Sequence, residues 1–74
     1  MTNTRLLKAK MIMNGDTIQT LADSIGINRV NASKKINGKR EFKQHEIAVI
    51  FRRYKLTYEE IESIFFSNLQ QEAV

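Results

Sequence analysis

Hydrophobic residues recur along this chain at intervals of three and four, the spacing that places side chains on one face of an α-helix. Leu7 and Met11 show it in a first segment that we expect to be helical from about Arg5 to Met13. Strand-type alternation is never sustained and proline is absent, so the pattern predicts an all-α domain. A later helix, expected from about 44 to 54, carries a complete apolar stripe of Ile47, Ile50, Phe51 and Tyr54.

Capping residues predict a second helix after the Asn14-Gly15 break. Asp16, with Gln19 three residues later, is expected to form a capping box that satisfies backbone N–H groups at its start. Gly26 suits the left-handed conformation that closes a helix. Its inward residues are expected to be Ile18, Leu21, Ala22 and Ile25.

Similar signals delimit the third and fifth helices. Asn28 is expected to cap a helix that reaches about Ile36 and stops at Asn37-Gly38. Thr57 and Glu60 predict a capping box for a last helix over about 58 to 69. The apolar stripe of that helix is Ile61, Ile64, Phe65 and Leu69.

Composition limits what the chain can do. Its 74 residues predict one small domain, with neither a cofactor nor a metal site, and the absence of cysteine suits a reducing, cytoplasmic compartment. No apolar run is long enough to cross a membrane. The single histidine begins a zinc-protease pattern, His45-Glu46, but Val49 stands where the second histidine belongs, so we expect no enzyme.

Charge is unevenly distributed along the chain. Residues 1 to 55 hold all twelve lysines and arginines and four of the eight acids, whereas residues 56 to 74 hold the other four acids and no base. Such clustering favours a polyanionic partner, because a local field attracts phosphates even when the total charge, +4, is modest. An ordinary solvated surface is the alternative.

The segment from 17 to 36 has the layout of a helix-turn-helix, in which the second of two short helices can enter the DNA major groove. Ala22 is small where the two helices approach, Gly26 supplies the turn and Ile27 points inward. Ala32 and Ile36 anchor the second helix to the core. Its outer surface is then covered by Arg29, Asn31, Ser33, Lys34 and Lys35, which suit base edges and phosphates.

The stretch "TIQTLADSIGINRVNASKKINGKREF", residues 17 to 42, resembles the Cro and phage-repressor helix-turn-helix family, the XRE class. The resemblance covers roughly 5 to 66 and implies a compact five-helix domain of the lambda-repressor type. It also implies a dimeric transcriptional regulator, of phage or prophage origin, that binds a pseudo-palindromic double-stranded DNA operator. Two departures are Ile18, where the family often has glutamine, and Lys43, where it often has a hydroxyl cap.

The resemblance also implies roles for individual residues. Base contacts are expected from Arg29, Val30, Asn31 and Lys34. Phosphate contacts are expected from Thr17, Asn37, Lys39 and Arg40, with Lys35 and Lys43 as further candidates.

A second function stays open: a protein-interaction module that binds and modulates a partner repressor through its last helix. The acidic, base-free end of the chain and the departure at Ile18 favour it. Adjacent phenylalanines lie about 100° apart on a helix, so a small core has difficulty burying both. We therefore expect a partner or homodimer interface formed by Phe65, Phe66 and Leu69.

Overall fold

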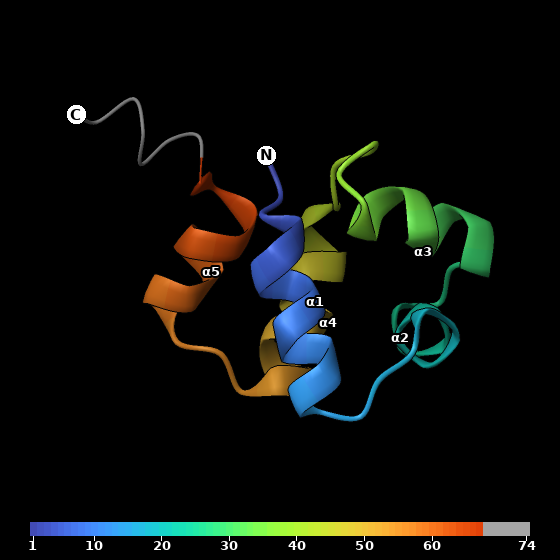
Figure 1. The fold of residues 1–74 in the computed structure, drawn as a ribbon, viewed down its shortest axis with the longest axis horizontal. Coiled ribbons are helices and arrows are strands. Elements are labelled where there is room, and N and C mark those ends of the chain that lie inside the picture. The colour runs from blue at the N-terminus through green and yellow to red at the C-terminus, as the bar shows by residue number, and fades with distance from the viewer. Residues whose placement is uncertain (68–74) are drawn as a thin grey trace.

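A computed structural model describes residues 1–67 and confirms an all-α fold of five helices (Figure 1). The first begins one residue earlier than predicted. The last ends at Phe65, with Phe66 as its C-cap, so the predicted end near 69 is too late; residues 68 and 69 lie outside the described residues. The bounds are α1 (Thr4–Met13), α2 (Ile18–Ile25), α3 (Arg29–Ile36), α4 (Gln44–Tyr54) and α5 (Tyr58–Phe65).

The helices surround one core to which each contributes a completely buried side chain. In Figure 1, α1 stands in the centre with α5 on one side, α2 and α3 on the other, and α4 behind it. α2 packs on α3 and α4, and α1 packs on α5 and α3. The buried side chains, each at most 1% exposed, are Leu7, Leu21, Ile36, Ile50 and Ile64.

A three-residue turn joins α2 to α3, and its first residue has a left-handed backbone. Gly26 has φ +87°, and its N–H and that of Ile27 both bond to the carbonyl of Ala22, at 2.8 and 3.1 Å. This conformation is cheap only for glycine. Figure 1 views α2 end-on while α3 lies across the view, so the two axes are steeply inclined to each other.

The predicted cap of α2 is wrong by one residue. Thr17 is the N-cap: its hydroxyl accepts the N–H of Thr20 at 3.1 Å, and the Thr20 hydroxyl accepts the N–H of Thr17 at 2.8 Å. Gln19 instead donates to Asp23 along the helix, at 2.8 Å. Asp16 lies before the cap, so its carboxylate is available for another helix.

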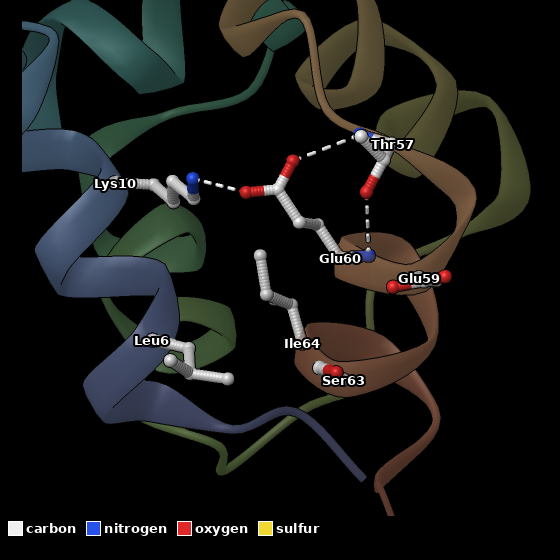
Figure 2. Close-up of a pocket in the computed structure, with 7 residues that line it drawn as sticks. All are labelled: Leu6, Lys10, Thr57, Glu59, Glu60, Ser63 and Ile64. Atoms are coloured by element: carbon white, nitrogen blue, oxygen red, sulfur yellow. Dashed lines mark hydrogen bonds and ion pairs between the residues drawn. The ribbon is translucent and has the colours of Figure 1, made fainter.

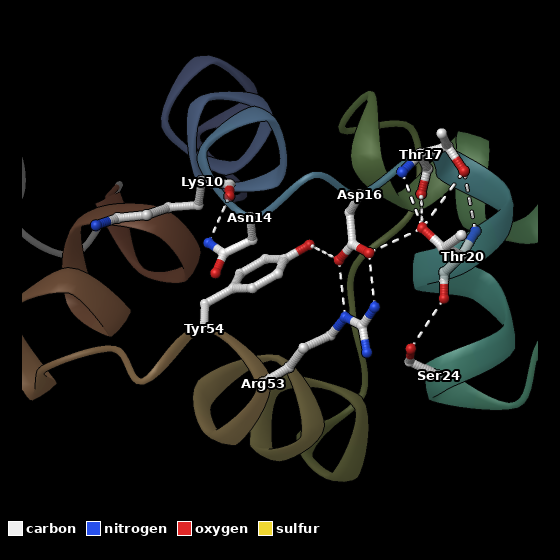
Figure 3. A network of polar contacts seen from close by, with 8 residues as sticks. All are labelled: Lys10, Asn14, Asp16, Thr17, Thr20, Ser24, Arg53 and Tyr54. Carbon is white, nitrogen blue, oxygen red and sulfur yellow. Dashed lines mark hydrogen bonds and ion pairs between the residues drawn. The ribbon is translucent and has the colours of Figure 1, made fainter.

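That carboxylate joins the α1–α2 connection to the end of α4 (Figure 3). Arg53 donates to it through Nε and Nη2 at 2.7 and 2.6 Å, the Tyr54 hydroxyl at 2.5 Å and the Thr20 hydroxyl at 2.8 Å. The Asp16 side chain is only 3% exposed. The hydrogen bonds from Arg53 hold the pKa of Asp16 far below its usual value of 3.8, more than offsetting the cost of burial.

Replacing Asp16 with asparagine tests this network. Asp16→Asn should lower the free energy of unfolding at pH 7 by about 2 kcal/mol, a value moderated by the partial exposure of Arg53. Because the folded-state pKa of Asp16 is lowered, its contribution to stability is present above pH 3.8 and is lost as the pH falls below that value. The difference in the free energy of unfolding between mutant and wild type should therefore become smaller in acid. Urea unfolding at several pH values measures both effects. The control, Asp23→Asn, removes an exposed acid of α2, and an equal loss in both mutants would contradict the role given to Asp16.

Candidate nucleic-acid interface

The outer surface of α3 carries most of the predicted base-contacting residues. Asn28 caps the helix by accepting the N–H of Asn31 at 2.8 Å, which places Arg29 and Val30 in its first turn. Val30 is 64% exposed although it is apolar, and Arg29 and Lys34 are exposed as well. A hollow of about 380 Å³ on this surface is lined by Ile18, Arg29, Val30, Ser33 and Lys34.

Asn31 is placed differently from the other three predicted base contacts. It is half-buried and does not line this hollow. Three of the four residues are therefore brought onto one surface, with Asn31 beside it on the same helix. Ser33, half-buried, joins the hollow instead.

Lys35 faces the protein interior, contrary to the expectation that it contacts phosphate. Its ammonium group donates to both carboxylate oxygens of Glu46 on α4, at 2.6 and 2.8 Å, and both side chains are buried. Successive residues of a helix are about 100° apart, so position 35 falls beside the buried stripe of Ala32 and Ile36. A lysine at such a position needs a buried anion, which Glu46 supplies.

Glu46 also stabilises the start of α4, which begins at Gln44. One of its carboxylate oxygens accepts the N–H of Lys43 at 2.8 Å, which is the half of a capping box that the third helical residue supplies, whereas the Lys43 side chain makes no capping hydrogen bond. Burial raises the pKa of Glu46, but the hydrogen bonds from Lys35 and from the Lys43 backbone outweigh it and leave the pKa below its usual value. The Lys43 side chain stays exposed.

Two of the residues predicted to contact phosphate lie in the connection that follows α3. Gly38, at φ +79°, donates its N–H to Lys35 and Lys39 donates to Lys34, which closes the helix and turns the chain outward. Lys39 and Arg40 are exposed in this connection. Gly38 also passes close to α1, since a β-carbon there would lie 3.3 Å from the Thr4 methyl group.

Thr17 and Asn37 meet at a second hollow of about 300 Å³ between α1, α2 and the end of α3. Both take part in capping: Thr17 as described above, and Asn37 by donating to the carbonyl of Ser33 at 2.9 Å. The same amide nitrogen also donates to the Ser33 hydroxyl at 3.4 Å. Lys8 of α1 lines the same hollow and was not predicted. Its position one residue after buried Leu7 marks it as exposed, but only packing shows which helix lies opposite.

The predicted partner interface is changed by the burial of Phe65. This ring is 4% exposed and makes an edge-to-face contact with Phe42, with centroids 5.5 Å apart, so it belongs to the core. Phe66 is 39% exposed and borders a hollow of about 300 Å³ with Met1 and Ile47. Leu69 lies outside the described residues. Of the three predicted residues, Phe66 is therefore the one that remains a candidate.

The acids of α5 are partly engaged within the fold. In a hollow of about 330 Å³ between α1 and α5, Glu60 pairs with Lys10 and also accepts the N–H of Thr57 at 2.9 Å, which completes the predicted capping box (Figure 2). The hydrogen bond from Lys10 lowers the pKa of Glu60 below its usual value. Glu60 therefore stabilises the α1–α5 contact, and Glu59 and Glu62 remain exposed.

Residues 1–67 contain no group of three or more His, Cys, Asp or Glu side chains arranged to hold a metal ion. None of their helices is long and apolar enough to cross a membrane.

No model of a known protein family matches the chain, and neither a curated protein nor a solved structure matches it.

Removing Glu46 tests the buried pair. Glu46→Ala should lower the free energy of unfolding by about 3 kcal/mol, because it leaves the Lys35 ammonium buried without its anion. The double mutant Lys35→Met/Glu46→Leu replaces both charges with apolar groups and should recover most of this loss. Chemical denaturation of both variants gives the comparison. A double mutant as unstable as the single one would show that the charge left behind is not the cause.

Proposed function

We propose that this protein is a sequence-specific DNA-binding transcriptional regulator, Cro-like or repressor-like, of phage or prophage origin. In this proposal α3 lies in the major groove of a pseudo-palindromic operator. One observation carries it: α3 is held to the core by Ala32, Ile36 and the Lys35–Glu46 pair, while Arg29, Val30 and Lys34 stay exposed together on its outer surface.

The chemistry of this surface fits base edges. Arginine can donate two hydrogen bonds to O6 and N7 of guanine, and a valine methyl can contact the methyl group of thymine. Asn31 is the candidate for adenine, and Lys34 for a guanine or a neighbouring phosphate. In this proposal, DNA binding buries the exposed Val30 side chain against the groove, which removes its apolar surface from water.

Electrostatics support the same surface. Within the described residues, three acids pair with cations: Asp16 with Arg53, Glu46 with Lys35, and Glu60 with Lys10. Neither Arg53 nor Lys10 is a candidate DNA contact, and Lys35 is no longer one because it is buried. No carboxylate in that part of the chain pairs with the cations of the outer α3 surface and the α3–α4 connection, which are Arg29, Lys34, Lys39 and Arg40. Their charges are available to displace counterions from DNA.

Two alanine substitutions distinguish base contacts from phosphate contacts. Arg29→Ala should weaken binding to a selected duplex by about 1 to 3 kcal/mol and relax the preference at one base pair. Lys39→Ala should weaken binding to selected and random duplexes alike and reduce the salt slope by about one. Duplexes recovered by in vitro selection, titrated over a salt series, provide the measurement. Equal losses on both kinds of duplex for both variants would remove α3 from its assigned role.

A second candidate function rests on Phe66. An exposed phenylalanine beside an apolar hollow suits a protein contact, either a second copy of this chain or a partner repressor that the protein modulates. The two functions are compatible, since α5 and α3 lie on opposite sides of α1 (Figure 1). Absence of duplex binding at low salt would favour the modulator.

Self-association can be tested at the same residue. We expect the wild type to dimerise at micromolar concentration and Phe66→Gln to raise the dimer Kd at least about tenfold, because a buried aromatic anchor at an interface contributes more than about 1.4 kcal/mol. Ile12→Gln, which changes an apolar residue of α1 that is more exposed than Phe66, is the control and should leave Kd unchanged. Sedimentation equilibrium measures both. A wild type that stays monomeric, and binds DNA as one monomer per site, would rule the dimer out.

A further inference from the structure

The outer surface of α3 belongs to a short helix with few apolar anchors. α3 has eight residues, and its buried apolar side chains are Ala32 and Ile36. These positions are one turn apart and form a single narrow stripe, to which Ala32 contributes one methyl group. Apolar contacts have no preferred direction, so the stripe holds the helix against the core but defines its rotation about its own axis only weakly.

One directional contact supplements this stripe. The Lys35 ammonium group donates to both carboxylate oxygens of Glu46 at 2.6 and 2.8 Å, and both side chains are buried. α3 packs on α2 and α1, and the pair ties it to a third helix, α4. Charge-assisted hydrogen bonds depend on distance and direction, and a buried charge that loses its partner is costly. The pair therefore opposes any rotation of α3 that separates the two groups.

Glu46 is itself held in place. The carboxylate oxygen that lies 2.6 Å from the Lys35 nitrogen also accepts the backbone N–H of Lys43, at 2.8 Å. The Glu46 side chain is thereby fixed to the first turn of α4, a helix whose Ile50 and Tyr54 are buried in the core. The anion is thus a fixed point against which α3 is aligned.

A small rotation of α3 has a large effect at its outer surface. A helix with its side chains is about 10 to 12 Å across, so turning it by about 20° moves the tip of a side chain by about 2 Å. Such a turn displaces Arg29, Val30 and Lys34 by this distance, whereas a binding group must be placed within about 0.5 Å of its productive geometry. The alignment of Lys35 with Glu46 inside the fold is therefore coupled to the alignment of the outer surface with a groove.

The net effect of the pair on stability is expected to be small. Taking two charges out of water costs about as much free energy as their attraction returns, so replacing such a pair with apolar side chains leaves stability nearly unchanged. The apolar residues hold α3 to the core, and the pair selects one rotation of it. The effect of the pair should accordingly be measurable in recognition rather than in the free energy of unfolding.

We infer that Lys35 and Glu46 are positioning residues for base recognition: they hold α3 at the one rotation at which Arg29, Val30 and Lys34 meet the base edges together. The inference rests on the proposed function. Neither Lys35 nor Glu46 contacts DNA in it, so they contribute to sequence preference without contributing to affinity for phosphates.

The test compares binding to a selected duplex with binding to random duplexes. Lys35→Met/Glu46→Leu should lower the ratio of the two affinities at least about tenfold, the equivalent of one well-aligned base contact. Binding to random duplexes and the slope of log K against log salt should stay unchanged, because no phosphate contact is removed. Lys35→Arg, which keeps a cation that can form two hydrogen bonds with the carboxylate, should retain the wild-type ratio.

The Lys10–Glu60 pair provides a matched control (Figure 2). Glu60, like Glu46, is the third residue of its helix, accepts the N–H of its N-cap residue and pairs with a lysine of another helix. Lys10→Met/Glu60→Leu thus removes the same two charges and the same kind of cap from a contact that does not involve α3, and should keep the wild-type ratio. Thermal unfolding establishes that each variant folds. If Lys35→Met/Glu46→Leu does not, Lys35→Met/Glu46→Gln keeps an acceptor for the cap of α4 and takes its place with the same expected fall.

The outcomes separate the inference from the proposed function. If the wild type binds no duplex at low salt, the proposed function is wrong and the inference falls with it. If the wild type prefers one sequence and the folded double mutant keeps the wild-type ratio, the inference alone is wrong. A parallel loss on selected and random duplexes would also overturn it, because it would indicate a lost phosphate contact. So would an equal fall in Lys10→Met/Glu60→Leu, which would indicate a general loosening of the fold.

Discussion

The buried ion pair between Lys35 and Glu46 fixes how α3 is rotated about its own axis, and the surface of the molecule depends on that rotation. A helix of eight residues has two turns, and Ala32 and Ile36 alone give it a narrow apolar stripe. The pair adds a third, directional contact to α4. Because an unpaired charge is costly in the interior, alternative rotations that separate these two groups are strongly disfavoured.

Two further ion pairs connect elements of the fold. Asp16 and Arg53 connect the start of α2 to the end of α4, and Glu60 and Lys10 connect α5 to α1. Each pair uses an acid to hold two helices together. These two acids and Glu46 are thereby engaged inside the fold or at helix contacts, while, among the described residues, the cations on the outer surface of α3 and in the connection after it form no salt bridge.

Several features could be predicted from local patterns because local physics decides them. The helices, their apolar stripes and the left-handed turn at Gly26 follow from spacing, capping and backbone sterics, which act within a few residues. The cap of α2 was predicted one residue early because Asp16 and Thr17 both have suitable side chains. In the structure the Asp16 carboxylate binds the guanidinium of Arg53, a residue far along the chain, and Thr17 caps the helix instead.

The sequence by itself determined the five helices, the single core and the exposed Arg29, Val30 and Lys34, because helical periodicity already separates inner from outer positions. The tertiary structure decided which polar residues are occupied elsewhere and which helices meet. Lys35 turned inward because Glu46 lies opposite, Phe65 packed on Phe42, and Lys8 came to line one hollow together with Asn37. These contacts join residues distant in the chain, and periodicity carries no information about which face of another helix will be the neighbour.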